Sequence, residues 1–152
     1  MLIDTHSHVN FKDFEPDFED VLARARQDNV VVINVGTQVR TSRRAVELAQ
    51  KYEKTFAAVG MHPIQLHERE IVEENTRFKS KAEDFDWAAF EQLARQDEVV
   101  AIGECGLDYY HIAVSDDIAS IKEKQKRVLH EQIELANQEE LPMMIHCRGS
   151  RD

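Results

Sequence analysis

Short apolar runs rich in β-branched residues alternate along the chain with amphipathic stretches. Each run has the length of a strand, and the stretches between them carry apolar residues three and four positions apart, as helices packed on one side do. The pattern predicts strands within 1–8 and at 30–36, 56–60, 99–103 and 141–146. It predicts helices at 17–28, after a cap at Thr41 or Ser42, at 87–95 and at 116–139. The charged segment 67–86 follows neither period, and we expect a surface loop or a ragged helix there.

Strict alternation of strand and helix predicts a parallel sheet with helical crossovers, in either a doubly wound sheet or a (β/α)8 barrel. The position of the polar residues separates the two folds. Several fall at the carboxyl ends of different strands: His8, His62, Glu104, Asp108 and His146. In a barrel these ends converge on one mouth, whereas an open sheet spreads them apart. We therefore expect the (β/α)8 TIM-barrel type, with only about five of its eight strands in residues 1–152.

The first strand carries the motif His6-x-His8 at its end. Residues two apart in a strand point to the same face, so the two imidazoles, with Asp4, are expected side by side. Two imidazoles so placed can bind a divalent metal ion. The alternative is a pair of histidines that serves packing or hydrogen bonding.

Glu104 and His146 extend this motif into a possible two-metal site. A set of three imidazoles and one carboxylate suits zinc, manganese, magnesium or another divalent ion, and a carboxylate can bridge two ions. Metals held in this way lower the pKa of bound water and can stabilise a phosphoryl transfer. We therefore predict His6, His8, Glu104 and His146 as ligands of two divalent ions, with Glu104 also as the catalytic residue. Taken alone, Glu104 would more often form a salt bridge at its strand end.

Three further residues are candidates for binding substrate. Arg148 has the forked donor geometry that suits phosphate oxygens, or it forms an ion pair at the rim. His62 could donate to a substrate phosphate or cap its turn. Asp108 could orient a metal-binding histidine or bond to the loop backbone.

The remaining histidines and the cysteines are given no part in the chemistry. We expect His67, His111 and His130 to be solvated. Strand alternation turns Cys105 and Cys147 away from the metal ligands, so we expect buried, inert thiols under the helices rather than ligands. Two cysteines also fit a reducing compartment better than a disulfide scaffold.

Composition limits the possible partners. Hydrophobic residues form 42% of the chain, which indicates a globular protein. The net charge of −10 gives no overall positive field for nucleic acid, so metal ions and local cations would have to offset the repulsion of a polyanion. We find neither a transmembrane run nor a signal peptide, and we expect no membrane partner and a cytoplasmic location.

Five motifs, in order along the whole chain, resemble the TatD family of metal-dependent deoxyribonucleases: 3–8, 35–37, 58–63, 101–110 and 142–148. In the long helix Gln125, Gln132 and Leu135–Ala136 also fit the family. The resemblance implies a (β/α)8 barrel that hydrolyses DNA phosphodiester bonds, often from the 3′ end. It also implies that His6 and His8 hold one metal, that Glu104 bridges two, and that His146 holds the second.

The chain departs from the family by its length. Family members continue through three more strands, which bring another histidine ligand and a late aspartate. We therefore expect residues 1–152 to be the N-terminal part of a single TatD-like barrel domain, a fragment of a longer enzyme. Its first and fifth strands would be open edges, through which the chain could self-associate.

Two other functions are consistent with the sequence. One is a metal-dependent ester or amide hydrolase of the amidohydrolase type, including enzymes that remove D-amino acids from tRNA. Against it, most amidohydrolases bridge their metals with a modified lysine, and no lysine lies within ten residues of Glu104. The other is a half-barrel that binds or assembles without catalysis.

Overall fold

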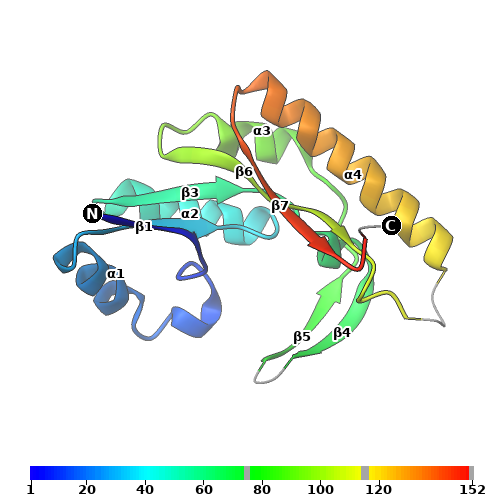
Figure 1. The fold of residues 1–152 in the computed structure, drawn as a ribbon, viewed down its shortest axis with the longest axis horizontal. Coiled ribbons are helices and arrows are strands. Elements are labelled where there is room, and N and C mark those ends of the chain that lie inside the picture. Colours follow the sequence, from blue (N-terminus) through cyan, green and yellow to red (C-terminus); the bar gives the residue numbers. More distant parts are fainter. Residues whose placement is uncertain (74–75, 114–116, 151–152) are drawn as a thin grey trace.

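Five strands form a parallel sheet in the order β1-β2-β3-β6-β7 in the computed structural model, which describes residues 1–73, 76–113 and 117–150 (Figure 1). These strands are β1 (Leu2–Ser7), β2 (Val30–Val35), β3 (Thr55–Val59), β6 (Val99–Asp108) and β7 (Met143–Arg148). The helices between them are α1 (Phe18–Gln27), α2 (Val39–Lys51), α3 (Trp87–Ala94) and α4 (Ile118–Gln138). Two 3-10 turns, η1 (Lys12–Phe14) and η2 (Pro63–Leu66), follow the ends of β1 and β3. The architecture is that of a partial (β/α) barrel, which confirms the predicted fold.

The two faces of the sheet are packed differently. On the outer face, Ala57 and Val59 of β3 join the main hydrophobic cluster with residues of α2, α3 and α4. On the inner face, Ala58 packs with Val35 and Ala101. Alternate residues of β3 therefore point to opposite faces of the sheet. One set packs in the core that the helices cover and the other packs in the barrel interior, as in a (β/α) barrel. Side chains at the carboxyl ends of the strands then lie together at the mouth of the interior.

β1 and β7 form the two edges of the sheet. Both present large apolar side chains to solvent, with Ile3 53% and Ile145 57% exposed. The open edges predicted for the first and fifth strands of the parallel sheet are therefore present in the described residues. Edges of this kind can pair with another strand.

The segment 67–86 differs from our expectation. It contains an antiparallel hairpin of β4 (Glu68–Glu73) and β5 (Thr76–Lys81) that projects from the sheet (Figure 1). In its register Glu68 lies opposite Lys81 and Glu70 lies opposite Lys79. Opposite charges that face each other across strands stabilise a hairpin. The charged residues that obscured the strand period in the sequence are thus part of the pairing.

Helix α2 begins earlier than predicted. Its N-cap is Gln38, and Thr41 lies in the first turn rather than at the cap. There the Thr41 Oγ1 accepts hydrogen bonds from the backbone N–H groups of Thr37 and Gln38, at 2.9 and 3.1 Å. Thr41 therefore satisfies donors at the start of the helix from inside it, as the third residue of a capping box does.

The prediction of two buried cysteines holds for Cys105 and is wrong for Cys147. Cys105 is fully buried, and its burial, with Glu104 nearby, raises the pKa of the thiol to about 12. Cys147 is exposed, with its Sγ 3.3 Å from Ser150 Oγ. The reason is its place on the edge strand β7, whose last residues are mostly exposed.

No helix in the described parts of the chain combines the length and the apolar character needed to cross a lipid bilayer.

Candidate metal centre

His6 and His8 lie together at the end of β1, as the sequence predicts, with ring centroids 5.0 Å apart. The Nδ1 of His8 lies 3.1 Å from the carbonyl oxygen of Val35. Because a carbonyl only accepts, this Nδ1 carries the proton and Nε2 keeps the lone pair that a metal needs. Burial lowers the pKa of His8, although the bond to Val35 opposes this effect. The neutral, metal-binding form of His8 is thereby favoured.

Glu104 lies between two groups of imidazoles and turns one oxygen toward each. Its Oε2 is 3.3 Å from His6 Nε2. Its Oε1 is 3.0 Å from His146 Nδ1 and 3.9 Å from His62 Nε2. Burial alone would raise the pKa of Glu104, but the hydrogen bond from His146 and the charges of His62 and His6 lower it to about 2. The carboxylate is therefore ionised and can accept on both sides.

His146, on β7, connects Glu104 to a second carboxylate. Its Nδ1 contacts Glu104 Oε1, and its Nε2 lies 3.2 Å from Asp108 Oδ2. These bonds, first to Asp108 and then to Glu104, raise the pKa of His146 to about 9 despite partial burial. With no metal present, His146 is therefore an imidazolium that donates to both carboxylates. A divalent cation can replace such a proton and restore the neutral ligand.

Asp108 is fully buried at the end of β6 and is held from three directions. Its Oδ2 accepts from His111 Nδ1 at 2.6 Å, and its Oδ1 accepts from the His111 backbone N–H at 3.0 Å. The Gln125 side chain of α4 bonds to the backbone N–H and carbonyl of Asp108, each at 2.9 Å. Burial would raise the pKa of Asp108, but the bonds from His146 and His111 hold it well below its usual range. Asp108 thus bonds both the loop backbone and His146, the two alternatives that the sequence allowed.

Two of the three histidines expected in solvent are instead buried. His111 is 8% and His67 is 7% exposed, whereas the His130 side chain is 73% exposed, as predicted. His111 is buried because the turn after β6 brings it back against Asp108, three residues earlier. The spacing Asp108-x-x-His111 could have indicated this contact. Gln125 could not be recognised as a support for Asp108 in the same way, because its position on the distant helix α4 depends on the fold.

His62 follows β3 and is buried close to His146, with ring centroids 4.2 Å apart. Its Nδ1 accepts the backbone N–H of Ile64 at 3.0 Å, which caps η2. In the neutral ring Nε2 therefore carries the proton and is a donor on the side of Glu104. Burial lowers the pKa of His62 to about 4, so the ring is neutral at physiological pH. In this tautomer Nε2 donates to substrate oxygens, and it would bind a metal ion only after losing that proton.

Arg148 lies beside Asp108 in the register of β6 and β7. It is exposed, and its guanidinium group lies over the Tyr110 ring, 4.3 Å from the centroid. This contact packs one face of Tyr110 and holds Arg148 near the mouth of the barrel. The structure therefore brings Arg148 to the same strand ends as the predicted ligands, and its contact with phosphate stays a prediction.

Gly106 allows β6 to approach β7 behind these side chains. Its φ of +147° lies in a region that residues with a side chain rarely adopt, and a Cβ added there would lie 2.0 Å from the His146 carbonyl oxygen. Only glycine fits this position without moving the strand that carries His146.

The donor atoms of the site form two groups that fit divalent ions. One group is His6, His8 and Glu104, and the other is His62, Glu104 and His146, with the donor atoms of each group within 4.8 Å of one another. Glu104 belongs to both groups and turns a different oxygen to each. Imidazole and carboxylate ligands with a shared carboxylate are typical of sites that bind two first-row divalent ions. The residues present therefore fit such ions.

Comparison with known proteins places this geometry in a family. The family model described as TatD related DNase matches residues 3–152. The chain is 35% identical to the "uncharacterized metal-dependent hydrolase YabD" of Bacillus subtilis, and the match covers 100% of the chain and 52% of that protein. It is 30% identical to the "3′-5′ ssDNA/RNA exonuclease TatD" of Salmonella typhimurium, over 99% of the chain and 51% of that protein.

A solved structure agrees with these matches. The crystal structure of YjjV, a TatD homologue from Escherichia coli K12, superposes with a TM-score of 0.76 and 34% identity, over 98% of this chain and 51% of that one. The chain thus spans about half the length of the relatives it matches.

Proposed function

Because the chain belongs to the family of TatD-related DNases, we propose that its metal centre hydrolyses phosphodiester bonds of DNA and removes nucleotides from the 3′ end. One observation carries the proposal: the Glu104 carboxylate turns one oxygen to His6 and the other to His146 and His62. The relative from Salmonella, which is named a 3′-5′ exonuclease, supports the choice of bond and direction.

The protein side chains bind and orient the reacting groups. Two divalent ions of zinc, manganese or magnesium, when bound by His6, His8, Glu104 and His146, supply Lewis acidity and lower the pKa of water. The Nε2–H group of His62 donates a hydrogen bond to a phosphate oxygen. Asp108 holds the His146 ring in place, so that this ligand keeps its orientation when the substrate binds.

Arg148 is the second donor that we assign to the substrate. Its guanidinium group can form two parallel hydrogen bonds with a phosphate. The stack on Tyr110 fixes the position of this group and so reduces the entropy lost on binding.

We also propose that residues 1–152 are the N-terminal part of one barrel domain. The support is that the relatives are about twice as long and that β1 and β7 are edges. These edges would pair with further strands of the same barrel or with a second copy of the chain. Size-exclusion chromatography with light scattering tests the second possibility, which predicts a dimer that dissociates on dilution.

The proposed activity is tested with single-stranded DNA labelled at its 5′ end, incubated with the 152-residue chain and Mn²⁺ or Mg²⁺. We expect a ladder of products shortened from the 3′ end, which EDTA abolishes. His6→Ala should remove the activity, and the matched control His130→Ala, which changes an exposed histidine on α4, should retain it. A chain that releases no nucleotide with any divalent metal would contradict the proposed activity of residues 1–152 by themselves and would leave the family assignment standing.

A second candidate is hydrolysis of a carboxylic ester or an amide, including a D-aminoacyl ester on tRNA. It is favoured by the name of the Bacillus relative, which specifies a metal-dependent hydrolase and no nucleic acid. Bis-p-nitrophenyl phosphate and p-nitrophenyl acetate separate the two reactions. Metal-dependent cleavage of the acetate alone would favour this second candidate.

A further inference from the structure

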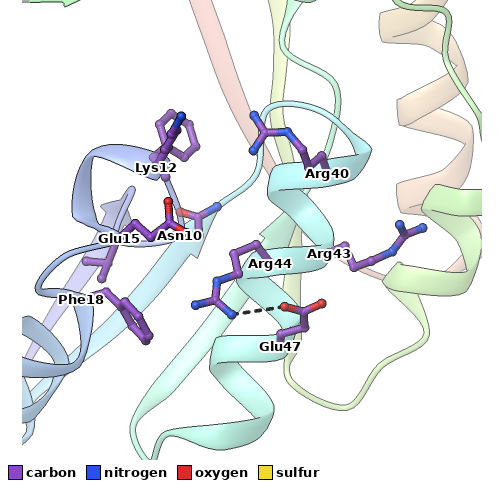
Figure 2. Close-up of a pocket in the computed structure, with 10 residues that line it drawn as sticks. Asn10, Lys12, Glu15, Phe18, Arg40, Arg43, Arg44 and Glu47 are labelled. Carbon is purple, nitrogen blue, oxygen red and sulfur yellow. Dashed lines mark hydrogen bonds and ion pairs between the residues drawn. The ribbon is translucent and has the colours of Figure 1, made fainter.

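A pocket of about 350 Å³ lies between the loop that follows β1 and the first turns of α2 (Figure 2). Phe11 connects it to the candidate metal centre, because its ring lines the pocket and stacks on His8 with a centroid distance of 4.3 Å. Asn10 anchors the loop, and its Nδ2 donates to the carbonyl oxygens of Val35 and Thr41 at 3.1 and 2.9 Å. These contacts therefore hold the pocket next to His8 at the end of β1.

Basic side chains outnumber acidic ones around this pocket. Its lining includes Lys12, Arg40, Arg43 and Arg44 against Glu15 and Glu47. Helix α2 carries four basic residues and one acidic residue, in a chain whose net charge is −10. Figure 2 shows Lys12 and Arg40 on opposite sides of one end of the pocket, whereas Arg43 points away from them. A local cluster of this kind is what a polyanion needs to approach an otherwise acidic protein.

The two cations at that end, Lys12 and Arg40, have no ion-pair partner among residues 1–73, 76–113 and 117–150. Both side chains are exposed, so a phosphate group can reach them from solvent. Arg44 differs, because it bonds to Glu47 at 3.3 Å and lies over the Phe18 ring.

Asn10 adds a buried group without a partner. The residue is 5% exposed, and its Oδ1 accepts no hydrogen bond from any described residue. This oxygen has almost no accessible surface, so it does not offer an acceptor to a ligand in the pocket. The match to a nucleotide therefore rests on the two exposed cations and on the position of the pocket beside the candidate metal centre.

We propose that this pocket binds a nucleotide of a single-stranded nucleic acid away from the bond that is cleaved, with its phosphate between Lys12 and Arg40. The proposal rests on the proposed function, since it assumes that the substrate of the metal centre is a nucleic acid. Contact between Phe11 and His8 places this nucleotide beside the metal centre. The strand is thereby held at two positions, which favours long substrates over short ones.

The test measures binding without cleavage. The 152-residue chain is titrated in EDTA against a fluorescein-labelled oligothymidylate of about ten nucleotides, a length that spans a typical single-strand site, and anisotropy is followed at several salt concentrations. The variant Lys12→Gln/Arg40→Gln should raise Kd at least about fivefold at low salt, and the slope of log K against log salt should decrease by about 0.7, since the two cations bind one phosphate and each phosphate contact to a single strand contributes about 0.7. Arg127→Gln, an exposed change on α4, should leave both unchanged.

Four results would overturn the proposal: no binding by the wild-type chain, unaltered binding by the double variant, an equal loss in Arg127→Gln, or affinity that does not rise from a dinucleotide to the longer strand. Because both altered side chains are exposed, the variant should fold, and an unchanged thermal unfolding curve verifies this.

Cleavage is assayed separately. Binding through the pocket with no metal-dependent cleavage would contradict the proposed function alone, and cleavage with unaltered binding by the variant would contradict the pocket alone.

Discussion

The candidate metal centre and the basic pocket both begin at the end of β1, yet their charged groups are in opposite situations. In the metal centre, Glu104 and Asp108 contact imidazole nitrogens at 2.6 to 3.3 Å, and their pKa values are far from the ordinary ones. In the pocket, Lys12 and Arg40 extend into solvent and form no ion pair in the described chain. The carboxylates of the metal centre are paired with histidines of the protein, whereas the cations of the pocket are available to a ligand.

This difference separates stability from recognition. Removing one partner from a buried network leaves another polar group unsatisfied, which costs folding free energy. Removing an exposed cation costs little. Changes in the metal centre should therefore alter unfolding, whereas changes in the pocket should alter binding alone.

The largest effect on stability is expected for Gly106→Ala. The new Cβ would overlap the His146 carbonyl oxygen and force β6 away from β7, at a cost of about 3 kcal/mol or more. Urea unfolding followed by circular dichroism measures it. Gly149→Ala, where φ is also positive but the nearest atom is 3.0 Å away, should lose only about 1 kcal/mol. Equal losses in the two variants would show that β6 and β7 are not closely coupled behind the site.

A smaller loss is expected for His111→Phe, which keeps a ring and removes the Nδ1 donor to Asp108 Oδ2. Asp108 would lose its shortest hydrogen bond while buried, and the free energy of unfolding should decrease by about 2 kcal/mol. The control His130→Phe changes an exposed histidine and should stay within about 0.5 kcal/mol. If both variants unfold like the wild-type chain, Asp108 does not depend on His111.

The pH dependence of unfolding in EDTA tests whether the histidines of the metal centre contribute to stability as their pKa shifts predict. The pKa of His146 is about 9 in the folded chain, above its unfolded value of about 6.5. Protonated His146 therefore makes its full contribution to the free energy of unfolding below pH 6.5, and this contribution is lost as the pH rises through 9. The pKa of His62 is lowered to about 4, so its contribution is present above pH 6.5 and lost as the pH falls through 4.

Thermal unfolding should thus show a maximum near pH 6.5. His146→Gln should flatten the alkaline side of the curve and leave the acidic side. An alkaline side that is unchanged in this variant would mean that another group loses the proton.

The smallest effect is expected for Lys12→Gln and Arg40→Gln. Each should change the free energy of unfolding by less than about 0.5 kcal/mol, since neither side chain has an ion-pair partner among the described residues. A loss of more than about 1 kcal/mol in chemical denaturation would show that these cations stabilise the fold, and the contrast between the two regions would fail.

The same contrast explains what the sequence could predict. His6, Glu104 and His146 follow apolar runs at strand ends. The alternation of strands and helices predicts a barrel, in which these ends meet at one mouth, so the sequence could predict that the three residues lie together. Arg40 lies in helix α2 and Lys12 lies in the 3-10 turn η1, and the placement of these two elements depends on the buried bonds of Asn10. No local pattern encodes such a contact. The pocket therefore became visible only in three dimensions.

The hairpin shows the same limit in the fold. Glu68 and Lys81 are thirteen positions apart, and their pairing across β4 and β5 cannot be read from a local period. The burial of His111 depends on a turn that folds back on Asp108. Contacts set by strand alternation were predictable, and the spacing Asp108-x-x-His111 could have indicated the contact within that turn. The cross-strand pairing of the hairpin and the docking of the loop after β1 were not predictable.

The central claim is that Glu104 is shared by two metal groups. The direct measurement is the number of Zn²⁺ or Mn²⁺ ions bound by the chain, from native mass spectrometry and calorimetric titration. We predict two ions for the wild-type chain, one for His6→Ala and one for His146→Ala, and at least about tenfold weaker binding of both ions in Glu104→Gln. If Glu104→Gln binds both ions as tightly as the wild-type chain does, Glu104 does not bridge them and the account is wrong.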